Sequence, residues 1–349
     1  MQSKKRMFLL ILLILVTGTL SAVVDIRSYE DAYIYTDSMR SAIYLYNGET
    51  EVLLRSAGAG YYYTLSAQQH LLGFKWREKR GGLEAPAYIN LNTREISILH
   101  EAVYCAGQVS FSNAGDIAFT IDNTLFVERD GERSSYDLGT YANLAPISPD
   151  GKKVVFNDEE DQLWIMDLLD PNNKKRITDG AYGHVFPSWS PDSRYIAYNR
   201  LDGMLFVYDT GNERMHHIGR GADFRWSGET GIFAYVRVEL DDQDAIVNTD
   251  IVVSDIAGDI RFETKTRDIM ETAPCFLPDA SILYMNNGIP DKNVLQNSLK
   301  KQNSITPLPV KFPSSPVTYE QQIPAADSYL DVPYVHQVYD TPGPRGYSS

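Results

Sequence analysis

Residues 189–198, Trp-Ser-Pro-Asp-Ser-Arg-Tyr-Ile-Ala-Tyr, contain the pattern from which the fold can be predicted. It joins an aromatic strand end, a Ser-Pro-Asp turn and a strand rich in aromatic and β-branched residues. Proline sets the φ angle of the second turn position, and the Asp192 side chain is suited to accept a backbone hydrogen bond within the turn. One such turn is common in proteins, so it is evidence for a particular fold only if it recurs along the chain.

The pattern recurs five more times along the chain. Measured at the serine or its equivalent, the anchors are Ser66, Ser112, Ser148, Ser190, Ser227 and Leu277. The steps between them are 46, 36, 42, 37 and 50 residues, and their mean of about 42 is the period of a four-stranded propeller blade. The sequence therefore predicts an all-β fold with six blades around a central channel, spanning residues 29–310.

A pair of apolar strands precedes the first anchor, at residues 33–35 and 43–46. No anchor accompanies this pair, so the count of six leaves it without a blade of its own. We expect it to complete the last blade from the N-terminal side.

The composition limits the class of protein to which the chain can belong. The 349 residues are 43% hydrophobic and 22% charged, as expected of a globular chain, and the formal net charge is −14. Such a charge repels phosphate backbones, so no nucleic-acid partner is expected. Two cysteines are too few for a fold built on disulfides, and we expect Cys105 and Cys275 to be buried free thiols.

The first residues have the layout of an export signal. Lys4, Lys5 and Arg6 precede an apolar run from Met7 to Val16, which ends in small and polar residues. We expect a signal-peptide helix over residues 1–22, either cleaved or kept as a membrane anchor. The remaining chain is then predicted to lie outside the cytoplasm, in contact with a membrane only through this segment if it stays uncleaved.

The repeated segments resemble the TolB-type, WD-repeat-like propeller, whose blades carry Trp-Ser-Pro-Asp-Gly-Lys-x-Ile-Ala-Phe. Residues 141–180 and 183–219 are the closest matches. The resemblance implies a binding role, because TolB proteins bind other envelope proteins and related repeats gate or dock substrates for fused peptidases. The repeats begin almost directly after the leader, without the amino-terminal α/β domain of TolB, so we do not expect a TolB orthologue.

A proline-rich stretch at residues 311–328 has the composition of a linker in a mostly irregular tail. Residues 329–349 resemble the opening of a papain-like cysteine peptidase of the bacteriocin-processing type, and the resemblance implies an oxyanion-holding role for Gln337. No cysteine follows Gln337. The chain is expected to be either a shortened form of a longer propeller-peptidase or a propeller with a vestigial tail.

No nucleophile, metal or cofactor motif is recognisable in the sequence, so no catalytic residue is predicted. The acidic runs at residues 158–161 and 241–244 are interpreted as solvated turns rather than calcium sites. Alignment of the repeats places four polar residues at the predicted channel mouth, namely Asn143, His184, Asp223 and Glu271. We expect these four to contact a ligand.

These patterns predict an exported, monomeric propeller that binds an envelope protein or a peptide. It would serve as the N-terminal, non-catalytic part of a cell-envelope peptidase, presenting substrates to it. The alternative is an enzyme, a lyase or glycosidase, with its active site in the channel. Convergent polar side chains at the channel mouth would favour the enzyme.

Overall fold

The computed structural model describes residues 24–294 except 31, 38, 47–49, 55, 80, 181, 268, 280 and 288, and every described element is a β-strand. The first three sheets each contain four antiparallel strands. They are β1 (Val24–Tyr29), β2 (Ala32–Thr36), β3 (Ile43–Tyr46) and β4 (Thr50–Leu54); β5 (Thr64–Ser66), β6 (Leu71–Trp76), β7 (Ala85–Asn90) and β8 (Ile96–Ile98); and β9 (Ser110–Phe111), β10 (Ile117–Ile121), β11 (Thr124–Arg129) and β12 (Glu132–Asp137).

The remaining strands form a three-stranded, a seven-stranded and a second three-stranded sheet. They are β13 (Lys153–Asn157), β14 (Leu163–Asp167) and β15 (Lys174–Arg176); β16 (His184–Trp189), β17 (Tyr195–Arg200), β18 (Met204–Asp209), β19 (Arg214–Trp226), β20 (Ile232–Leu240), β21 (Ile246–Asp255) and β22 (Ile260–Glu263); and β23 (Glu271–Phe276), β24 (Ser281–Asn286) and β25 (Ile289–Val294).

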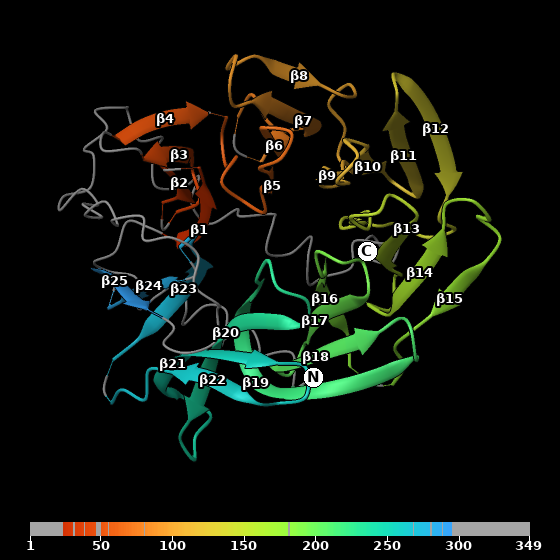
Figure 1. Ribbon diagram of the computed structural model, residues 1–349. Helices are drawn as coiled ribbons and strands as arrows, with labels where there is room; N and C mark the ends of the chain where they lie inside the picture. The colour runs from red at the N-terminus through yellow and green to blue at the C-terminus, as the bar shows by residue number, and fades with distance from the viewer. Residues whose placement is uncertain are drawn as a thin grey trace, which may run out of the picture.

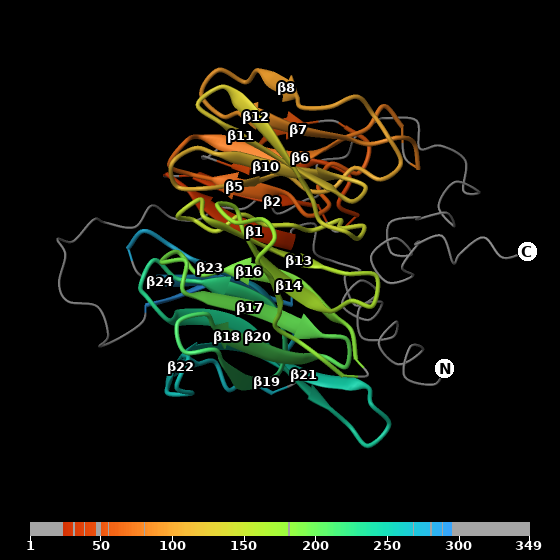
Figure 2. The ribbon, with the colours of Figure 1, turned by 90° about the vertical axis from the view of Figure 1, so that its right-hand side faces the viewer.

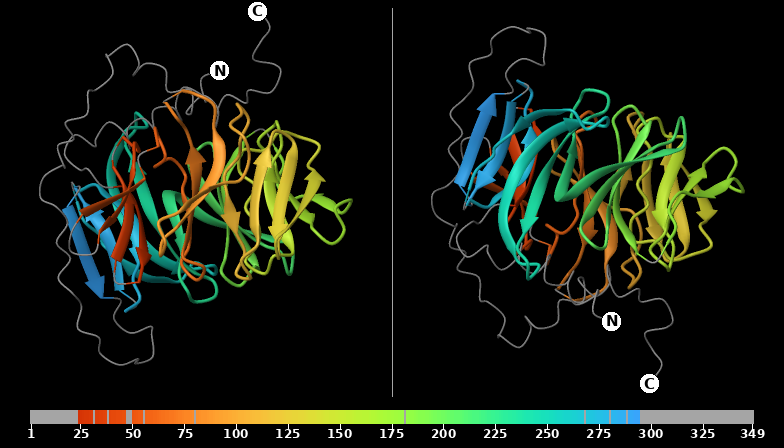
Figure 3. Two further views of the ribbon diagram at one scale, coloured as in Figure 1. Left: turned by 90° about the horizontal axis from the view of Figure 1, so that it is seen from above. Right: turned by 90° about the horizontal axis from the view of Figure 1, so that it is seen from below.

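The long strand β19 belongs to two units. Its residues up to Arg220 pair with β18, and its residues from Gly221 onward pair with β20. The six sheets therefore divide into seven units, which follow one another around a common centre in Figure 1 and stand side by side in Figure 3. We call each unit a blade and number the blades one to seven in chain order.

The expectation of six blades is therefore corrected. The six anchors mark blades two to seven. Five lie at the turn after the first strand of their blade, and Ser148 precedes β13 of blade four, next to the isolated bridge between Ile147 and Val154. Blade one turns instead at Tyr29 and Ala32, which are paired across a tight hairpin without a Ser-Pro-Asp segment. An anchor count cannot detect this blade.

The expected role of the early strand pair is also wrong. Residues 33–35 and 43–46 lie in β2 and β3, which pair with β1 and β4 rather than with the last blade. Blade one instead packs face to face against blade seven through buried side chains that include Ile26, Tyr44 and Leu283. Strand β1 already begins at Val24, before the predicted start of the propeller at residue 29.

The anchor turns have the hydrogen bonds that the sequence predicts. The buried Ser190 hydroxyl donates to Asp192 at 2.5 Å and accepts from the Tyr195 amide at 2.8 Å. The Asp192 carboxylate also accepts from the Arg194 amide at 3.2 Å. The bond from the Tyr195 amide satisfies two polar groups that are buried, whereas Asp192 and Arg194 are exposed.

Tryptophan side chains at the ends of inner strands connect neighbouring blades. The Trp189 indole donates to the Pro146 carbonyl at 2.9 Å, and the Trp226 indole donates to the Ser188 carbonyl at 3.1 Å. Each acceptor lies two residues before the anchor of the preceding blade. The bond therefore repeats with the blade period and adds direction to the apolar packing between blades.

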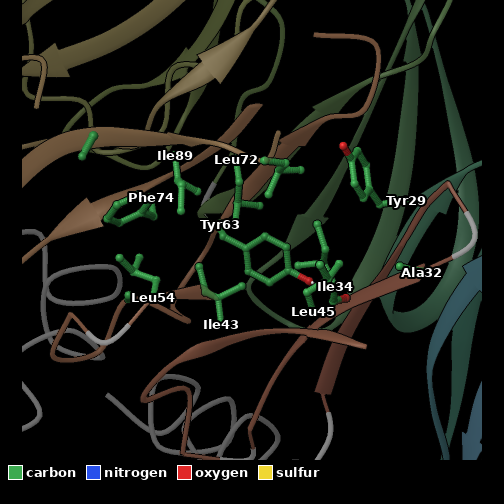
Figure 4. Close-up of a cluster of buried hydrophobic side chains, with 13 residues drawn as sticks. Tyr29, Ala32, Ile34, Ile43, Leu45, Leu54, Tyr63, Leu72, Phe74 and Ile89 are labelled. Carbon is green, nitrogen blue, oxygen red and sulfur yellow. Dashed lines mark hydrogen bonds between the residues drawn. The ribbon is translucent and has the colours of Figure 1, made fainter. Parts of the chain in front are cut away.

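The core consists of separate apolar layers between neighbouring blades. Figure 4 shows the layer between blades one and two, where the Tyr63 ring lies among Ile34, Ile43 and Leu72. The Tyr63 hydroxyl contacts the backbone carbonyls of Ile34, at 3.2 Å, and Asp25. This layer holds the loop before β5 against the inner strand of blade one.

Strand parity places the loops on two faces. A chain that passes through four antiparallel strands returns to the face where it entered, so the loops leading into each inner strand and the loops between second and third strands share one face. We call it the mouth face. The hairpin of β20 and β21, on this face, extends beyond the other strands in Figure 2.

Several expectations fall outside the described residues. These are the signal segment at 1–22, the linker at 311–328 and the peptidase-like fragment at 329–349 with Gln337. Within the described part of the chain, no helix is long and apolar enough to cross a membrane.

Candidate functional site at the propeller axis

The inner strands share a backbone irregularity at one position of the repeat. Pairing shifts by a β-bulge in β1, β16, β19 and β23, and the bulge residue has a positive φ angle in each. With Tyr62, just before β5, these residues are Asp25 (51°), Tyr62 (50°), Phe186 (57°), Asp223 (50°) and Ala273 (52°).

A positive φ at a residue other than glycine costs on the order of 1 to 3 kcal/mol and persists only where the surrounding structure holds it. Each of these five residues lies four positions before its anchor or the equivalent residue of blade one. Bulges re-aim side chains next to binding sites. The recurrence therefore marks this level of the axis as the candidate site.

An aromatic pair spans the axis at this level. Tyr62 precedes the inner strand of blade two, and Phe186 lies in the inner strand of blade five. Their rings are stacked with centroids 5.3 Å apart, and Tyr61 meets Tyr62 edge-on at 5.5 Å. Because blades two and five lie on different sides of the ring in Figure 1, this contact narrows the channel.

A charged cluster lies beside the aromatic pair. The Asp25 carboxylate contacts Arg27 of the same strand at 2.8 Å and Arg225 of blade six at 2.7 Å. Arg40 lies over the Tyr61 ring at 5.2 Å and is electrostatically coupled to Asp25 and Asp223. Three arginines and two aspartates from blades one and six thus meet at the axis, so the cluster has a net positive charge.

The surroundings shift the pKa values of this cluster in opposite directions. Burial raises the pKa of Asp25, but the charges of Arg27, Arg225 and Arg40 outweigh burial and lower it below its ordinary value. Burial raises the pKa of the Cys275 thiol to about 11, although Arg27 and Arg225 oppose the shift. Asp25 is therefore ionised at neutral pH, and Cys275 is a protonated, unreactive thiol.

A second buried ionic cluster lies on the mouth face between blades two and four. Lys75 is 4% exposed and donates to Glu84 at 2.9 Å and to Asn143 at 2.6 Å, while Arg77 pairs with the other Glu84 oxygen. The Asn143 carbonyl also accepts from the Gln108 amide at 2.9 Å. Asn143 thus links three successive blades.

His184 is buried at the start of β16, with its ring edge-on to Tyr198 at a centroid distance of 5.5 Å. Its amide donates to the Asp161 carbonyl at 2.7 Å, and its buried Nδ1 has no hydrogen-bond partner. Burial, together with the charge of Arg200, lowers the pKa of His184 to about 4. The imidazole is therefore neutral at pH 7.

The lowered pKa of His184 predicts that the folded protein loses stability in acid. Between its ordinary pKa of 6.5 and about 4, the unfolded chain binds a proton that the folded chain does not. The contribution of His184 to stability should therefore fall as the pH decreases through this window, by up to about 3 kcal/mol, and stay constant at lower pH. Urea titrations at several pH values should show a flatter profile for His184→Phe than for the unmodified protein, and His217→Phe, at an exposed position, is the control.

Glu271 begins β23 and is fully buried. Its Oε2 accepts from the Ile251 amide at 3.2 Å and contacts the Thr264 hydroxyl, which also lies 3.2 Å from Asp250. Its Oε1 is buried without a hydrogen-bond partner. Burial raises the pKa of Glu271, and the nearby Asp250 charge adds to the shift.

The four residues expected at the channel mouth are held by different neighbours. Asp223 belongs to the axial cluster, while Asn143, His184 and Glu271 lie in separate hydrogen-bond networks. Their role in ligand binding stays a prediction.

Sequence reasoning missed the axial residues Arg27, Tyr62, Phe186 and Arg225. The repeat itself contained a usable signal, since Tyr62 and Phe186 lie four residues before their anchors and Arg225 lies two before Ser227. In a propeller, residues at one repeat position lie at one level of the axis.

The acidic run at residues 158–161 is more ordered than the sequence suggested. Asp158 accepts from the Trp164 indole at 2.7 Å and from the amides of Glu160 and Gln162, each at 2.9 Å. Asp158 is therefore a turn-capping residue rather than a freely solvated carboxylate. Among the described residues, no group of three or more His, Cys, Asp or Glu could hold a metal ion.

Both cysteines are free thiols, as expected. Cys275 is buried in the layer between blades one and seven, whereas Cys105 is only half-buried.

Comparison with known proteins supports the fold more than the function. No family model matches the chain. Over 100 residues it is 28% identical to the "Putative Tricorn-like protease C-terminal subunit" of Sulfurisphaera tokodaii, covering 28% of this chain and 11% of that protein. The chain thus spans about a tenth of the length of this curated relative.

One solved structure has a TM-score above 0.5 and supports the fold. A chain in the crystal structure of the mitotic checkpoint complex has a TM-score of 0.52 at 12% identity, with 75% of this chain and 83% of that chain covered. The tricorn protease has a TM-score of 0.44 at 15% identity, with 76% of this chain and 28% of that chain covered. The chain therefore has a β-propeller-type, WD-like fold with distant similarity to a tricorn-like protease subunit.

Proposed function

We propose that this chain is a non-catalytic module that binds proteins or peptides at its mouth face. The observation that carries the proposal is the distribution of exposed large apolar side chains. Four of the ten in the described residues lie in mouth-face loops, each in a different blade or connection. They are Met39, Leu83, Tyr104 and Tyr182.

The opposite face has one such side chain in its described loops, Leu169. Exposed apolar side chains that gather on one face mark interaction surfaces, whereas scattered ones need no explanation. The axial cluster lies toward the same end of the ring, because the bulged residues lie near the start of each inner strand. A ligand at the mouth face would therefore contact both the exposed apolar side chains of the mouth-face loops and the axial arginines.

The biological setting is part of the proposal. The basic and apolar segment before residue 24 supports export, and the curated relative is named as a protease subunit. We infer that the chain acts outside the cytoplasm as a monomer and presents envelope proteins or peptides to a cell-envelope peptidase, of which it forms the N-terminal part. The TolB-type assignment of the repeat and the peptidase-like interpretation of residues 329–349 belong to this proposal.

The binding function can be tested with a library of random 12-residue peptides on a solid support. The protein should retain a subset of peptides, and the double variant Tyr104→Ala/Tyr182→Ala should lose them. The matched control is Leu169→Ala, on the opposite face and 80% exposed, which should retain the same subset. Equal retention by all three proteins would contradict binding at the mouth face.

The absence of catalysis can be tested with a broad fluorogenic peptide panel, with and without a thiol-alkylating reagent. No turnover is expected, because Cys275 is buried and its thiol pKa is raised to about 11. Turnover abolished by the reagent would implicate Cys105 or Cys275. Turnover that survives the reagent would favour an enzyme in the channel.

A further inference from the structure

The charges of the mouth face are divided between two halves. The acidic half comprises the mouth-face loops of blades three to six, residues 99–109, 122–123, 138–147, 158–162, 177–183, 201–203 and 241–245. These loops contain eleven Asp and Glu residues and no Lys or Arg, while Arg200 at the end of β17 and Arg220 at the crossing inside β19 both contact Asp202. The other half, made of the described mouth-face loops of blades one, two and seven, contains three acidic residues and five Lys and Arg.

Apolar side chains lie within the acidic half. Tyr104 is 73% exposed, Tyr182 is 44% exposed, and Val247, beside the 241–245 turn, is 46% exposed. Arg200 lies over the Tyr182 ring at 4.8 Å and pairs with Asp202 at 2.7 Å, which fixes the ring at the surface. Aromatic rings held in place are effective contact residues because they lose little conformational entropy on binding.

Two acidic turns of this half are pre-organised. Asp241 accepts from the amides of Gln243 and Ala245 at 2.8 and 2.9 Å, which closes the tip of the β20–β21 hairpin. Asp158 closes the 158–162 turn in the same way. The exposed Asp242 therefore lies on the ordered tip of the β20–β21 hairpin, which extends beyond the other strands in Figure 2. The exposed Glu160 lies on the ordered 158–162 turn of blade four.

We propose that the acidic half of the mouth face docks a polypeptide segment that carries both Lys or Arg and apolar side chains. The proposal rests on the proposed binding function and adds the class of partner. Charge complementarity favours a basic segment and opposes nucleic acids and anionic lipid surfaces. Exposed ion pairs contribute little affinity each, so the carboxylates accelerate encounter while Tyr104, Tyr182 and Val247 supply apolar contact.

The experiment measures association rates by surface plasmon resonance with three synthetic 15-residue peptides of equal apolar content. Their polar positions are all Lys, all Gln or all Glu. The Lys peptide should associate at least tenfold faster than the Gln peptide at low salt, with the advantage shrinking at 0.3 M salt as screening increases. The Glu peptide should bind most slowly.

A matched pair of variants locates the effect. Glu160→Lys/Asp242→Lys changes two exposed carboxylates of the acidic half, and Asp170→Lys/Asp259→Lys makes the same change in net charge at exposed turns of the opposite face. The first variant should lose about tenfold in association rate for the Lys peptide, and the second less than about threefold. Urea titration of both checks that they are folded.

Equal losses in both variants would show that net charge, not this surface, attracts the peptide, and would overturn the docking proposal. Equal binding of the Lys and Gln peptides, lost in Tyr104→Ala/Tyr182→Ala, would overturn the partner class and leave the proposed function standing. Failure of all three peptides to bind would count against both.

Discussion

Trp189→Ala should lower the free energy of unfolding by about 3 to 5 kcal/mol, the range of large aromatic truncations in cores. The indole is 7% exposed and packs with Val155, Leu163 and Ile196 between blades four and five. The same substitution removes the 2.9 Å hydrogen bond to the Pro146 carbonyl and leaves that acceptor without its indole partner. Two neighbouring blades therefore lose packing and a directional contact together.

Urea titration measures this loss, and two further variants separate its parts. Trp189→Phe keeps an aromatic ring but not the indole donor, so it should cost less than Trp189→Ala, with about 1 kcal/mol attributable to the hydrogen bond. Leu169→Ala removes a side chain that is 80% exposed and should change stability by no more than about 0.5 kcal/mol. Similar losses for Trp189→Ala and Leu169→Ala would mean that the inter-blade layer does not hold the ring together.

Asp25→Asn should destabilise the protein by about 2 to 4 kcal/mol, somewhat below the range for a fully buried pair because Arg27 and Arg225 are partly exposed. Asparagine tolerates the positive φ angle of this position, so the substitution removes the charge and leaves the backbone conformation accessible. Arg27 and Arg225 would then face each other without the carboxylate that both contact.

The pH dependence of the stability of Asp25→Asn gives an independent test of the axial ion pairs. The pKa of Asp25 is lowered in the folded state, so its stabilising contribution is present above pH 3.8 and is lost as the pH falls through the folded value. The variant should therefore lose less stability than the unmodified protein when the pH is lowered from 4 to 2. Asp259→Asn, at an exposed turn, is the control. A variant as stable as the unmodified protein at pH 7 would show that the axial ion pairs do not matter for folding.

Local chemistry explains which parts of the fold could be predicted. The Ser-Pro-Asp turn closes with hydrogen bonds inside a few residues, as at Ser190 and Asp192, so its sequence is sufficient to place it. The same reasoning failed for blade one, because the turn between Tyr29 and Ala32 uses no such segment. The expectation that Cys105 and Cys275 are free thiols is confirmed, but the expected burial holds for Cys275 alone, because Cys105 is half-buried.

The all-β repeat, its period and the positions of six turns could be predicted because these features depend on contacts between residues close together in the chain. The number of blades, the closure of blade one against blade seven and the axial cluster depend on contacts that form only in the complete ring. Asp25 and Arg225 are 200 positions apart, and Tyr62 meets Phe186 only after the intervening blades have completed part of the ring. The separation of the mouth face into an acidic half and another half also depends on the ring. Loops far apart in sequence lie on one face only because each blade passes through its antiparallel strands and returns to the face where it began.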